Sequence, residues 1–214
     1  MLNILIVLGS YLFGGIPVAY LTGKALRGVD IRERGSGNAG ASNVWQTVSR
    51  GAVVPVGLAE IAQGALPILA AEALGAGRGV QALAGLAAVG GHNWSPFLRF
   101  SGGRGVAHAI GFMLVLSRPA LVAFTAVSLA GVALRTVPQL VGLGVLSAPL
   151  AALAARQPAE TVAGLWGVAG LIALKRALSN EPSLPAWDVL RNRLLYDRDT
   201  RERDAWVERG SDEN

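Results

Sequence analysis

Residues 2–21 read LNILIVLGSYLFGGIPVAYL, a stretch that contains no charged side chain. An α-helix rises about 1.5 Å per residue, so a helix of this length crosses the ~30 Å hydrocarbon core of a bilayer. The stretch begins without a basic segment and carries no convincing cleavage site. We therefore interpret it as a retained membrane span and not as a signal peptide.

Six further apolar stretches follow it, at residues 51–74, 79–91, 105–116, 120–134, 138–155 and 160–174. Hydrophobic residues make up 52% of the 214 residues and charged residues 15%, with a mean hydropathy of +0.45. A soluble domain of this size normally carries more charge. The sequence thus predicts an all-α, polytopic membrane helix bundle of about seven transmembrane helices. Gly, Ala and Ser recur at helical spacing, which favours close packing of short helices.

The stretches at 79–91 and 105–116 are short for membrane spans. Each would reach only about 20 Å as a helix. Two interpretations stay open for them. They are tilted spans extended by flanking residues, or they are two halves of one re-entrant element, which leaves five crossings with the same sidedness.

The distribution of basic residues predicts the orientation. With the N-terminus outside, only Arg78, Arg118 and Arg156 lie outside, and the other sixteen of nineteen Lys and Arg lie inside. Such an excess is typical of cytoplasmic segments. We expect a multi-pass protein of the cell membrane with a cytoplasmic C-terminus.

The chain is expected to divide into a membrane domain, residues 1–179, and a polar cytoplasmic tail, residues 180–214. Within the tail, Trp187, Leu190, Leu194 and Leu195 have helical spacing, which predicts a short amphipathic helix on the membrane surface. We expect the end beyond Arg203 to be disordered.

Composition excludes several kinds of site. The chain has no cysteine, which rules out disulfides, thiolate metal sites and a cysteine nucleophile. Two histidines are too few for a histidine-rich metal cluster, so we expect no metal. The net charge of +5 comes mainly from arginines whose placement fixes the orientation in the membrane. No basic stripe alternates with aromatic residues, so we expect membrane lipids and no nucleic acid as partners.

The first polar loop contains the stretch GSGNAGASN at residues 35–43. Glycines allow backbone N–H groups to converge on one oxyanion, and hydroxyl and amide side chains can add donors. The loop is either such an anion site or a flexible polar connector. Its candidate binding residues are Gly35, Ser36, Gly37, Asn38, Gly40, Ser42 and Asn43.

The second polar loop lies within GHNWSPFLRFSGGRGVA at residues 91–107. Gly102, Gly103, Arg104 and Gly105 precede an apolar helix predicted to begin near Val106. Free N–H groups and the dipole at a helix N-terminus favour an anion, and the arginine fork suits phosphate or carboxylate. The sequence predicts that both loops share one face of the membrane.

Three more polar residues are candidates. His92 can orient a substrate hydroxyl or transfer a proton, and a purely structural hydrogen bond is an equal alternative. Glu60 and Gln63 lie three residues apart inside a span, on one helix face. Polar groups at membrane depth usually face a cavity or a partner, so we expect the same of this pair.

At these two loops the sequence resembles the bacterial acyl-phosphate:glycerol-3-phosphate acyltransferase family. The family's first motif has the form GSGNxGATNxxR, and GSGNAGASN matches it with Ser42 in place of Thr. The second has the form GHxxPxxxxFxGGKGVAT. It matches GHNWSPFLRFSGGRGVAH except for a one-residue offset at Pro96, Arg104 for Lys and His108 for Thr.

The resemblance implies a reaction. The primary hydroxyl of glycerol-3-phosphate attacks the carbonyl carbon of an acyl phosphate, which gives lysophosphatidic acid and phosphate without a cofactor. It implies that Ser36, Asn38 and Asn43 help to hold phosphate and that Arg104 takes the place of the family's lysine. His92 would hydrogen-bond near the reacting hydroxyl. We accordingly expect the active site to lie on the cytoplasmic face and the enzyme to be a monomer.

The chain departs from the family at several cations. Gln46 stands where the first motif ends in arginine, and Gln63 replaces the lysine of a usual Asp-x-x-Lys. The third motif, near HRxNIxRLLxGxE, has only a loose counterpart in Lys175-Arg176, residues 192–195, and Asp197 or Asp199. Arg50 or a tail arginine is a candidate replacement.

Two other functional classes remain open at the level of sequence. One is a transporter of anions or phosphate compounds, with short half-spans beside a midplane site. The other is a divergent member of the family that has another acceptor or serves as a silent membrane scaffold.

Overall fold

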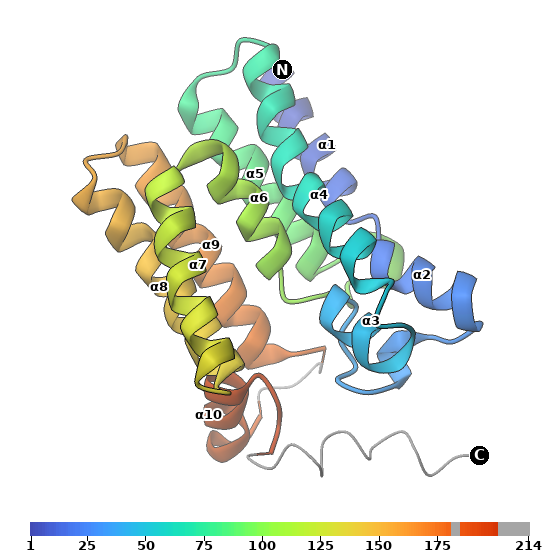
Figure 1. Cartoon of the computed structure of the whole chain (residues 1–214). Helices are drawn as coiled ribbons and strands as arrows, with labels where there is room; N and C mark the ends of the chain where they lie inside the picture. The colour runs from blue at the N-terminus through green and yellow to red at the C-terminus, as the bar shows by residue number, and fades with distance from the viewer. Residues whose placement is uncertain (181–184, 201–214) are drawn as a thin grey trace.

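The computed structural model of the chain describes residues 1–180 and 185–200 (Figure 1). The described residues form helices and connecting turns, with no strand, as predicted. The helices are α1 (Leu2–Gly14), α2 (Val18–Arg27), α3 (Ala41–Thr47), α4 (Val53–Ala73), α5 (Arg78–Asn93), α6 (Val106–Leu116), α7 (Arg118–Ala133), α8 (Val137–Ala154), α9 (Ala159–Leu178) and α10 (Trp187–Tyr196), with 3-10 turns η1 (Ile31–Glu33) and η2 (Pro96–Leu98).

The predicted apolar stretches after the first coincide with α4 to α9, within a few residues at each end. Among the described residues, four stretches are long and apolar enough to cross a membrane: Leu2–Arg27, Val53–Ala73, Val137–Ala154 and Ala159–Leu178. The helices α6 and α7 are shorter but also apolar. The fold is the predicted polytopic helix bundle.

The long helices lie side by side and run alternately in opposite directions (Figure 1). The helix α1 packs against α5 and α4, α4 packs against α6, and α5 packs against α9. A second group is formed by α7, α8 and α9. The small helices α2, α3 and α10 sit at the end of the bundle opposite the N-terminus, where the two polar loops also lie.

The first apolar stretch is not one continuous helix, contrary to the simplest prediction. The helix α1 ends at Gly14 and α2 starts at Val18, because Pro17 has no backbone N–H with which to continue the helical ladder. The break frees carbonyl groups. Gln63 of α4 donates from Nε2 to the carbonyl oxygens of Phe13 at 2.9 Å and Ile16 at 3.1 Å. The partner expected for the polar side chain of Gln63 is therefore the pair of backbone carbonyls at this break.

Glycines bring the helices of the first group into backbone contact. A Cβ atom at Gly64 of α4 would overlap the carbonyl oxygen of His108 in α6, and one at Gly111 would overlap that of Ile61. The same relation joins α1 and α5 at Gly91, whose added Cβ would meet the carbonyl oxygen of Tyr11. The predicted packing through small residues is confirmed at these crossings.

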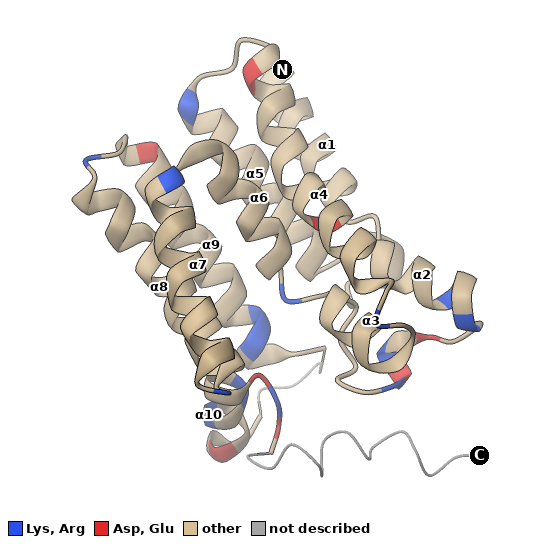
Figure 2. Ribbon diagram, in the orientation of Figure 1, with Lys and Arg blue, Asp and Glu red and all other residues tan. Residues whose placement is uncertain are grey.

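Basic residues gather at the end of the bundle that carries α2, α3 and α10 (Figure 2). The opposite end holds the N-terminus and the first residues of α5 and α7, which are Arg78 and Arg118. This distribution agrees with the sidedness expected from the sequence. The orientation of the termini in a membrane stays a prediction. The part of the predicted tail beyond residue 200 lies outside the described residues.

Substitution at one glycine of α4 should separate packing from helix propensity. Gly64→Ala should lower the thermal unfolding temperature in detergent, because overpacking of a close contact typically costs about 1–3 kcal/mol. Gly57→Ala lies on the same helix with nothing within 4 Å of the added Cβ, so it should leave that temperature unchanged or slightly higher. Equal unfolding temperatures for the two variants would contradict the close α4–α6 contact.

Candidate functional site

The side chain of Asn43 holds the first polar loop in shape. Its Nδ2 donates to the carbonyl oxygens of Ile31 at 2.6 Å, Asn38 at 3.0 Å and Arg34 at 3.1 Å. Its Oδ1 accepts from the backbone N–H of Ser36 at 3.2 Å. Asn43 is fully buried. Since its donors are all directed at loop carbonyls, Asn43 contributes to the site by fixing the loop.

The loop that Asn43 organises contains two glycines with positive φ, Gly35 at 56° and Gly37 at 65°. Such a conformation is accessible to glycine without strain. The hydroxyl of Ser36 and the Oδ1 atom of Asn38 are buried and have no hydrogen-bond partner among the described residues. A buried polar group without a partner is costly, so these two atoms are suited to meet a polar ligand.

Residues on either side support the first loop. Glu60 of α4 is buried, and its carboxyl group lies near the backbone N–H of Ala41 at the start of α3. Arg32 donates from Nη1 to the carbonyl oxygen of Leu98, at 3.2 Å, in the second loop. Its Nη2 also pairs with Asp30 at 2.7 Å, and this hydrogen bond holds the pKa of Asp30 below its ordinary value.

The second loop folds against the end of α5. The backbone N–H of Gly103 donates to the carbonyl oxygen of His92 at 3.0 Å. A Cβ atom at Gly102 would overlap that same carbonyl, and one at Gly103 would overlap Nε2 of His92. The glycines of this loop are thus required for the close approach of backbone and imidazole.

The helix α6 begins where this loop ends. Its N-cap residue is Gly105, with φ of 76°, and no side chain caps the helix. Gly105 is buried beside Asn93, whose Oδ1 atom is also buried without a partner among the described residues. The free N–H groups of the first turn and the helix dipole favour a negative charge at this point.

Arg104 comes directly before that N-terminus and is only 6% exposed. Its Nη1 donates to the carbonyl oxygen of Lys175 at 3.0 Å and to the Ser179 hydroxyl at 3.4 Å. Its Nε lies 2.8 Å from Oδ1 of Asp197, a residue of the tail. The arginine that the sequence singled out is therefore fixed by the end of α9 and by the tail.

One side chain joins the two loops. Asn180, just after α9, donates from Nδ2 to the carbonyl oxygens of Gly37 at 3.2 Å and Gly102 at 3.4 Å. Its Oδ1 accepts from the backbone N–H of Gly102 at 3.2 Å and from Nζ of Lys175 at 2.7 Å. The loops predicted to share one face of the membrane are thus in contact through Asn180.

Sequence reasoning missed Asn180 and gave Lys175 no clear role. Lys175 is fully buried, and its ammonium group lies 5.4 Å from the centre of the Trp94 ring. A buried lysine near the end of an apolar helix is an unusual feature in itself. That feature was visible in the sequence as the Lys175-Arg176 pair, whereas nothing in the sequence distinguished Asn180 from an ordinary loop residue.

His92 and His108 form a buried pair of imidazoles. Their ring centroids are 4.2 Å apart with a 36° angle between planes. Both ring nitrogens of His108 are buried and have no hydrogen-bond partner among the described residues. Sequence reasoning gave His108 no role. Its ring contacts His92, which in turn lies against Gly103 of the second loop.

Three predicted residues lie at the edge of the site. Ser42 and Gln46 are exposed on α3, and Arg50 is exposed in the turn between α3 and α4. None of these side chains makes a hydrogen bond or ion pair with another described residue. A role for Gln46 or Arg50 at the bound ligand stays a prediction.

Comparison with known proteins gives a consistent result. The family profile for glycerol-3-phosphate acyltransferase matches residues 4–180. Glycerol-3-phosphate acyltransferase 5 of Dehalococcoides mccartyi is 37% identical over 221 residues, which covers 97% of this chain and 94% of that protein. The glycerol-3-phosphate acyltransferase of Rubrobacter xylanophilus is 46% identical over 119 residues, or 56% of this chain and 59% of that protein.

Two solved structures are similar to the whole bundle. Both are of PlsY (YgiH), an integral membrane glycerol 3-phosphate acyltransferase. Its lysophosphatidic acid form gives a TM-score of 0.77 at 28% identity and covers 97% of this chain and 98% of that one. Its glycerol 3-phosphate form gives a TM-score of 0.75 at 28% identity, with 87% and 96% covered.

Replacing one amide group should test how the first loop is held. Asn43→Asp keeps the shape of the side chain but turns its three donated hydrogen bonds into contacts between oxygens. We expect faster amide hydrogen exchange across residues 31–43, measured by mass spectrometry in detergent. Ser49→Ala, in the turn after α3, is the control and should exchange like the parent protein. Unchanged exchange in Asn43→Asp would show that the loop is held by other contacts.

Proposed function

Because this chain belongs to the glycerol-3-phosphate acyltransferase family, we propose that it transfers a fatty acyl group from acyl phosphate to glycerol-3-phosphate for phospholipid synthesis. The observation that carries the chemistry is the junction of the two loops at Asn180. It brings the unpartnered hydroxyl of Ser36 and the uncapped start of α6 to one end of the bundle. Both substrates carry phosphate, which accounts for two neighbouring anion sites.

The reaction needs positioning more than chemical activation. Acyl phosphate is a mixed anhydride, so its carbonyl carbon is already electrophilic and phosphate is a competent leaving group. The primary hydroxyl of glycerol-3-phosphate attacks that carbon, the bond to the phosphate oxygen breaks, and the hydroxyl proton passes to a phosphate oxygen. Holding the two substrates in line and stabilising the developing charge supply most of the acceleration.

The basic residues beside the loops can stabilise the negative charge of the substrates and of the transition state. Arg104, Lys175 and Arg176 are all buried, and Asp197 is the acidic partner of the two arginines. A cluster of three basic groups and one carboxylate keeps a net attraction for a phosphate dianion. We assign Arg104 to the phosphate and to the negative charge that develops on the carbonyl oxygen.

Ser36 and the backbone amides of its loop bind the second phosphate in this proposal, and His92 orients the attacking hydroxyl. The arrangement of His92 against Gly103 keeps the imidazole next to the loop that carries Arg104. On the predicted orientation the site opens to the cytoplasm, where both phosphorylated substrates would be found. We expect the enzyme to act as a monomer without a cofactor.

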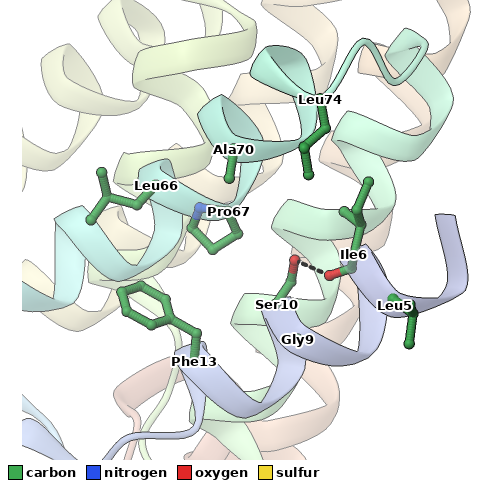
Figure 3. Close-up of a pocket in the computed structure, with 9 residues that line it drawn as sticks. All are labelled: Leu5, Ile6, Gly9, Ser10, Phe13, Leu66, Pro67, Ala70 and Leu74. Carbon is green, nitrogen blue, oxygen red and sulfur yellow. Dashed lines mark hydrogen bonds between the residues drawn. The ribbon is translucent and has the colours of Figure 1, made fainter. Parts of the chain in front are cut away.

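The acyl chain requires an apolar path, and the structure offers one between α1 and α4. This groove has a volume of about 380 Å³ and is lined by Leu5, Ile6, Gly9, Ser10, Phe13, Leu66, Pro67, Ala70 and Leu74 (Figure 3). Its one hydroxyl, on Ser10, is satisfied by the carbonyl oxygen of Ile6 at 2.6 Å. The groove can therefore accept a hydrocarbon chain without burying an unpaired polar group.

One end of the groove, at Phe13, lies next to Gln63 of α4. On α4, Gln63 and Glu60 continue the helix face that begins in the groove with Pro67, since the spacing of three and four residues repeats along one side of a helix. Gln63 contacts the groove residue Phe13, and Glu60 lies near the start of α3, next to the first loop. A chain in the groove would thus have its reactive head at the loops.

The central test is an assay with purified protein in detergent, palmitoyl phosphate and labelled glycerol-3-phosphate. We expect lysophosphatidic acid and phosphate as products. Arg104→Ala and Ser36→Ala should each remove most of the activity, because a lost hydrogen bond to a charged group is worth about 1.5–3 kcal/mol, or roughly one to two orders of magnitude in rate. Unfolding temperatures of the variants control for folding.

Normal turnover by both variants would contradict the phosphate assignment. If the parent protein formed no product but moved labelled glycerol-3-phosphate into sealed vesicles, the chain would be a transporter. Failure in both assays would leave the silent scaffold.

The acyl groove can be tested by filling it. Nothing lies within 4 Å of a Cβ atom added at Gly9, so Gly9→Leu should fit the helix and occupy the groove. We expect kcat/KM for palmitoyl phosphate to fall about tenfold, since a hydrophobic pocket discriminates by this order when its volume changes. The value for octanoyl phosphate should change little. The matched control is Gly170→Leu on α9, also in open space, which should alter neither value. An unchanged chain-length preference in Gly9→Leu would mean that the groove holds membrane lipid.

A further inference from the structure

The tail residue Asp197 is part of the site because it contacts Arg104 directly. Its Oδ1 lies 2.8 Å from Nε of Arg104, and the side chain of Arg104 is 6% exposed. The same oxygen lies 3.8 Å from Nε of Arg176. Asp197 comes immediately after α10, so this contact joins a segment beyond the membrane helices to the second glycine-rich loop.

The contacts of Arg104 divide its guanidinium into held and free parts. Nε lies 2.8 Å from Oδ1 of Asp197 and forms an ion pair with it that does not have hydrogen-bond geometry, and Nη1 donates to the Lys175 carbonyl and the Ser179 hydroxyl. Nη2 makes no hydrogen bond with any described residue. The ion pair at Nε and the hydrogen bonds of Nη1 together restrict the orientation of the planar guanidinium, and Nη2 is the terminal group left for a ligand.

Asp197 takes a backbone conformation that glycine adopts more readily. Asp197 has φ of 56°, in the left-handed region at the end of α10. Glycine or asparagine is the usual residue at such a helix end, and an aspartate there tolerates the conformation less well than glycine. Its carboxylate is the acidic group that lies between two buried arginines, which would otherwise repel each other.

We propose that Asp197 is a positioning residue of the acyltransfer site, which holds Arg104 so that Nη2 faces the phosphate-bearing substrate. The helix α10 and its C-terminal turn are then required for full activity. This inference rests on the proposed function, because it takes Arg104 as the phosphate ligand. It also accounts for an arginine at this position. A lysine has one nitrogen and could not contact Asp197, the Lys175 carbonyl and a substrate through separate groups.

The first variant is Asp197→Asn, which removes the charge, keeps the shape and suits the left-handed backbone. We expect kcat/KM for palmitoyl phosphate and glycerol-3-phosphate to fall about tenfold, since a misplaced charge-assisted hydrogen bond costs about that factor. Asp197→Glu should recover part of the loss. The matched control is Asp188→Asn, in the exposed first turn of the same helix, which should behave like the parent protein.

The decisive measurement places Asp197→Asn in an Arg104→Lys background. If Asp197 acts through the guanidinium, the substitution should lower kcat/KM by less than about twofold there, because the lysine has no Nε to be held. An equal loss in both backgrounds would overturn the proposal, since it would mean that Asp197 acts only by fastening α10 through Arg176. A gain in activity in Asp197→Asn would also overturn it, because the carboxylate would then compete with substrate for Arg104.

These outcomes are distinct from a failure of the proposed function. An inactive parent protein would refute acyl transfer, whereas an active parent with an unaffected Asp197→Asn variant would refute only the role of the tail. Unfolding temperatures measured in parallel identify a purely structural effect, which would lower the temperature equally in both Arg104 backgrounds.

Discussion

Backbone contact between helices at glycine is the constraint on which the rest of the structure depends. At Gly64 and Gly111 the helices α4 and α6 approach so closely that a single added methyl group would overlap a carbonyl oxygen, and Gly91 does the same between α1 and α5. In a bilayer, apolar burial gives little drive for helices to associate, so packing at this range carries much of the stability. The two polar loops emerge from these helices, and their separation is set by the crossings.

Where the helices end, buried polar groups must be satisfied within the protein. Asn43 pairs with four backbone groups of its own loop, and Gln63 pairs with the carbonyls freed by the break near Pro17. Asn180 then connects the first loop with the second. Three amide side chains thus organise backbone that has no regular structure. The Ser36 hydroxyl and the Oδ1 atom of Asn38 are the buried side-chain groups of the first loop that have no partner among the described residues.

The sequence predicted the helices well because hydropathy acts locally. The stretches that became α4 to α9 were found within a few residues, and the start of α6 near Val106 was correct. The break at Pro17 was overlooked, since apolar composition alone does not reveal where the helical ladder stops. Composition also singled out both glycine-rich loops as candidates for polar chemistry, and that assignment stays a prediction.

What the sequence did not reveal is the direction of individual side chains. Asn43 was predicted to hold phosphate alongside Ser36, yet its donors are directed at loop carbonyls. Asn180 was not found, and Asp197 was named only as a loose counterpart of the third motif, without its contact to Arg104. Both follow the last long helix, and their partners lie far away in sequence, at Gly37, Gly102 and Arg104. Such contacts depend on the path of the chain after α9, which no local pattern specifies.

The chain lacks two cations that the family motifs contain, at Gln46 and at Gln63. Losing cations at Gln46 and Gln63 would weaken a phosphate site if nothing replaced them. Gln63 now pairs with the break in α1, and Gln46 is exposed on α3, so neither position needs a charge to keep the fold. The buried lysine and arginine side chains among the described residues are Arg104, Lys175, Arg176 and Arg193, close to the second loop and the tail. Such a concentration would be unstable without an acidic partner, because buried like charges repel and each loses its hydration. Asp197 supplies that partner from the tail. In the proposed site the phosphate-binding cations lie near the end of α9, and Asp197 of the tail offsets the repulsion between the two arginines.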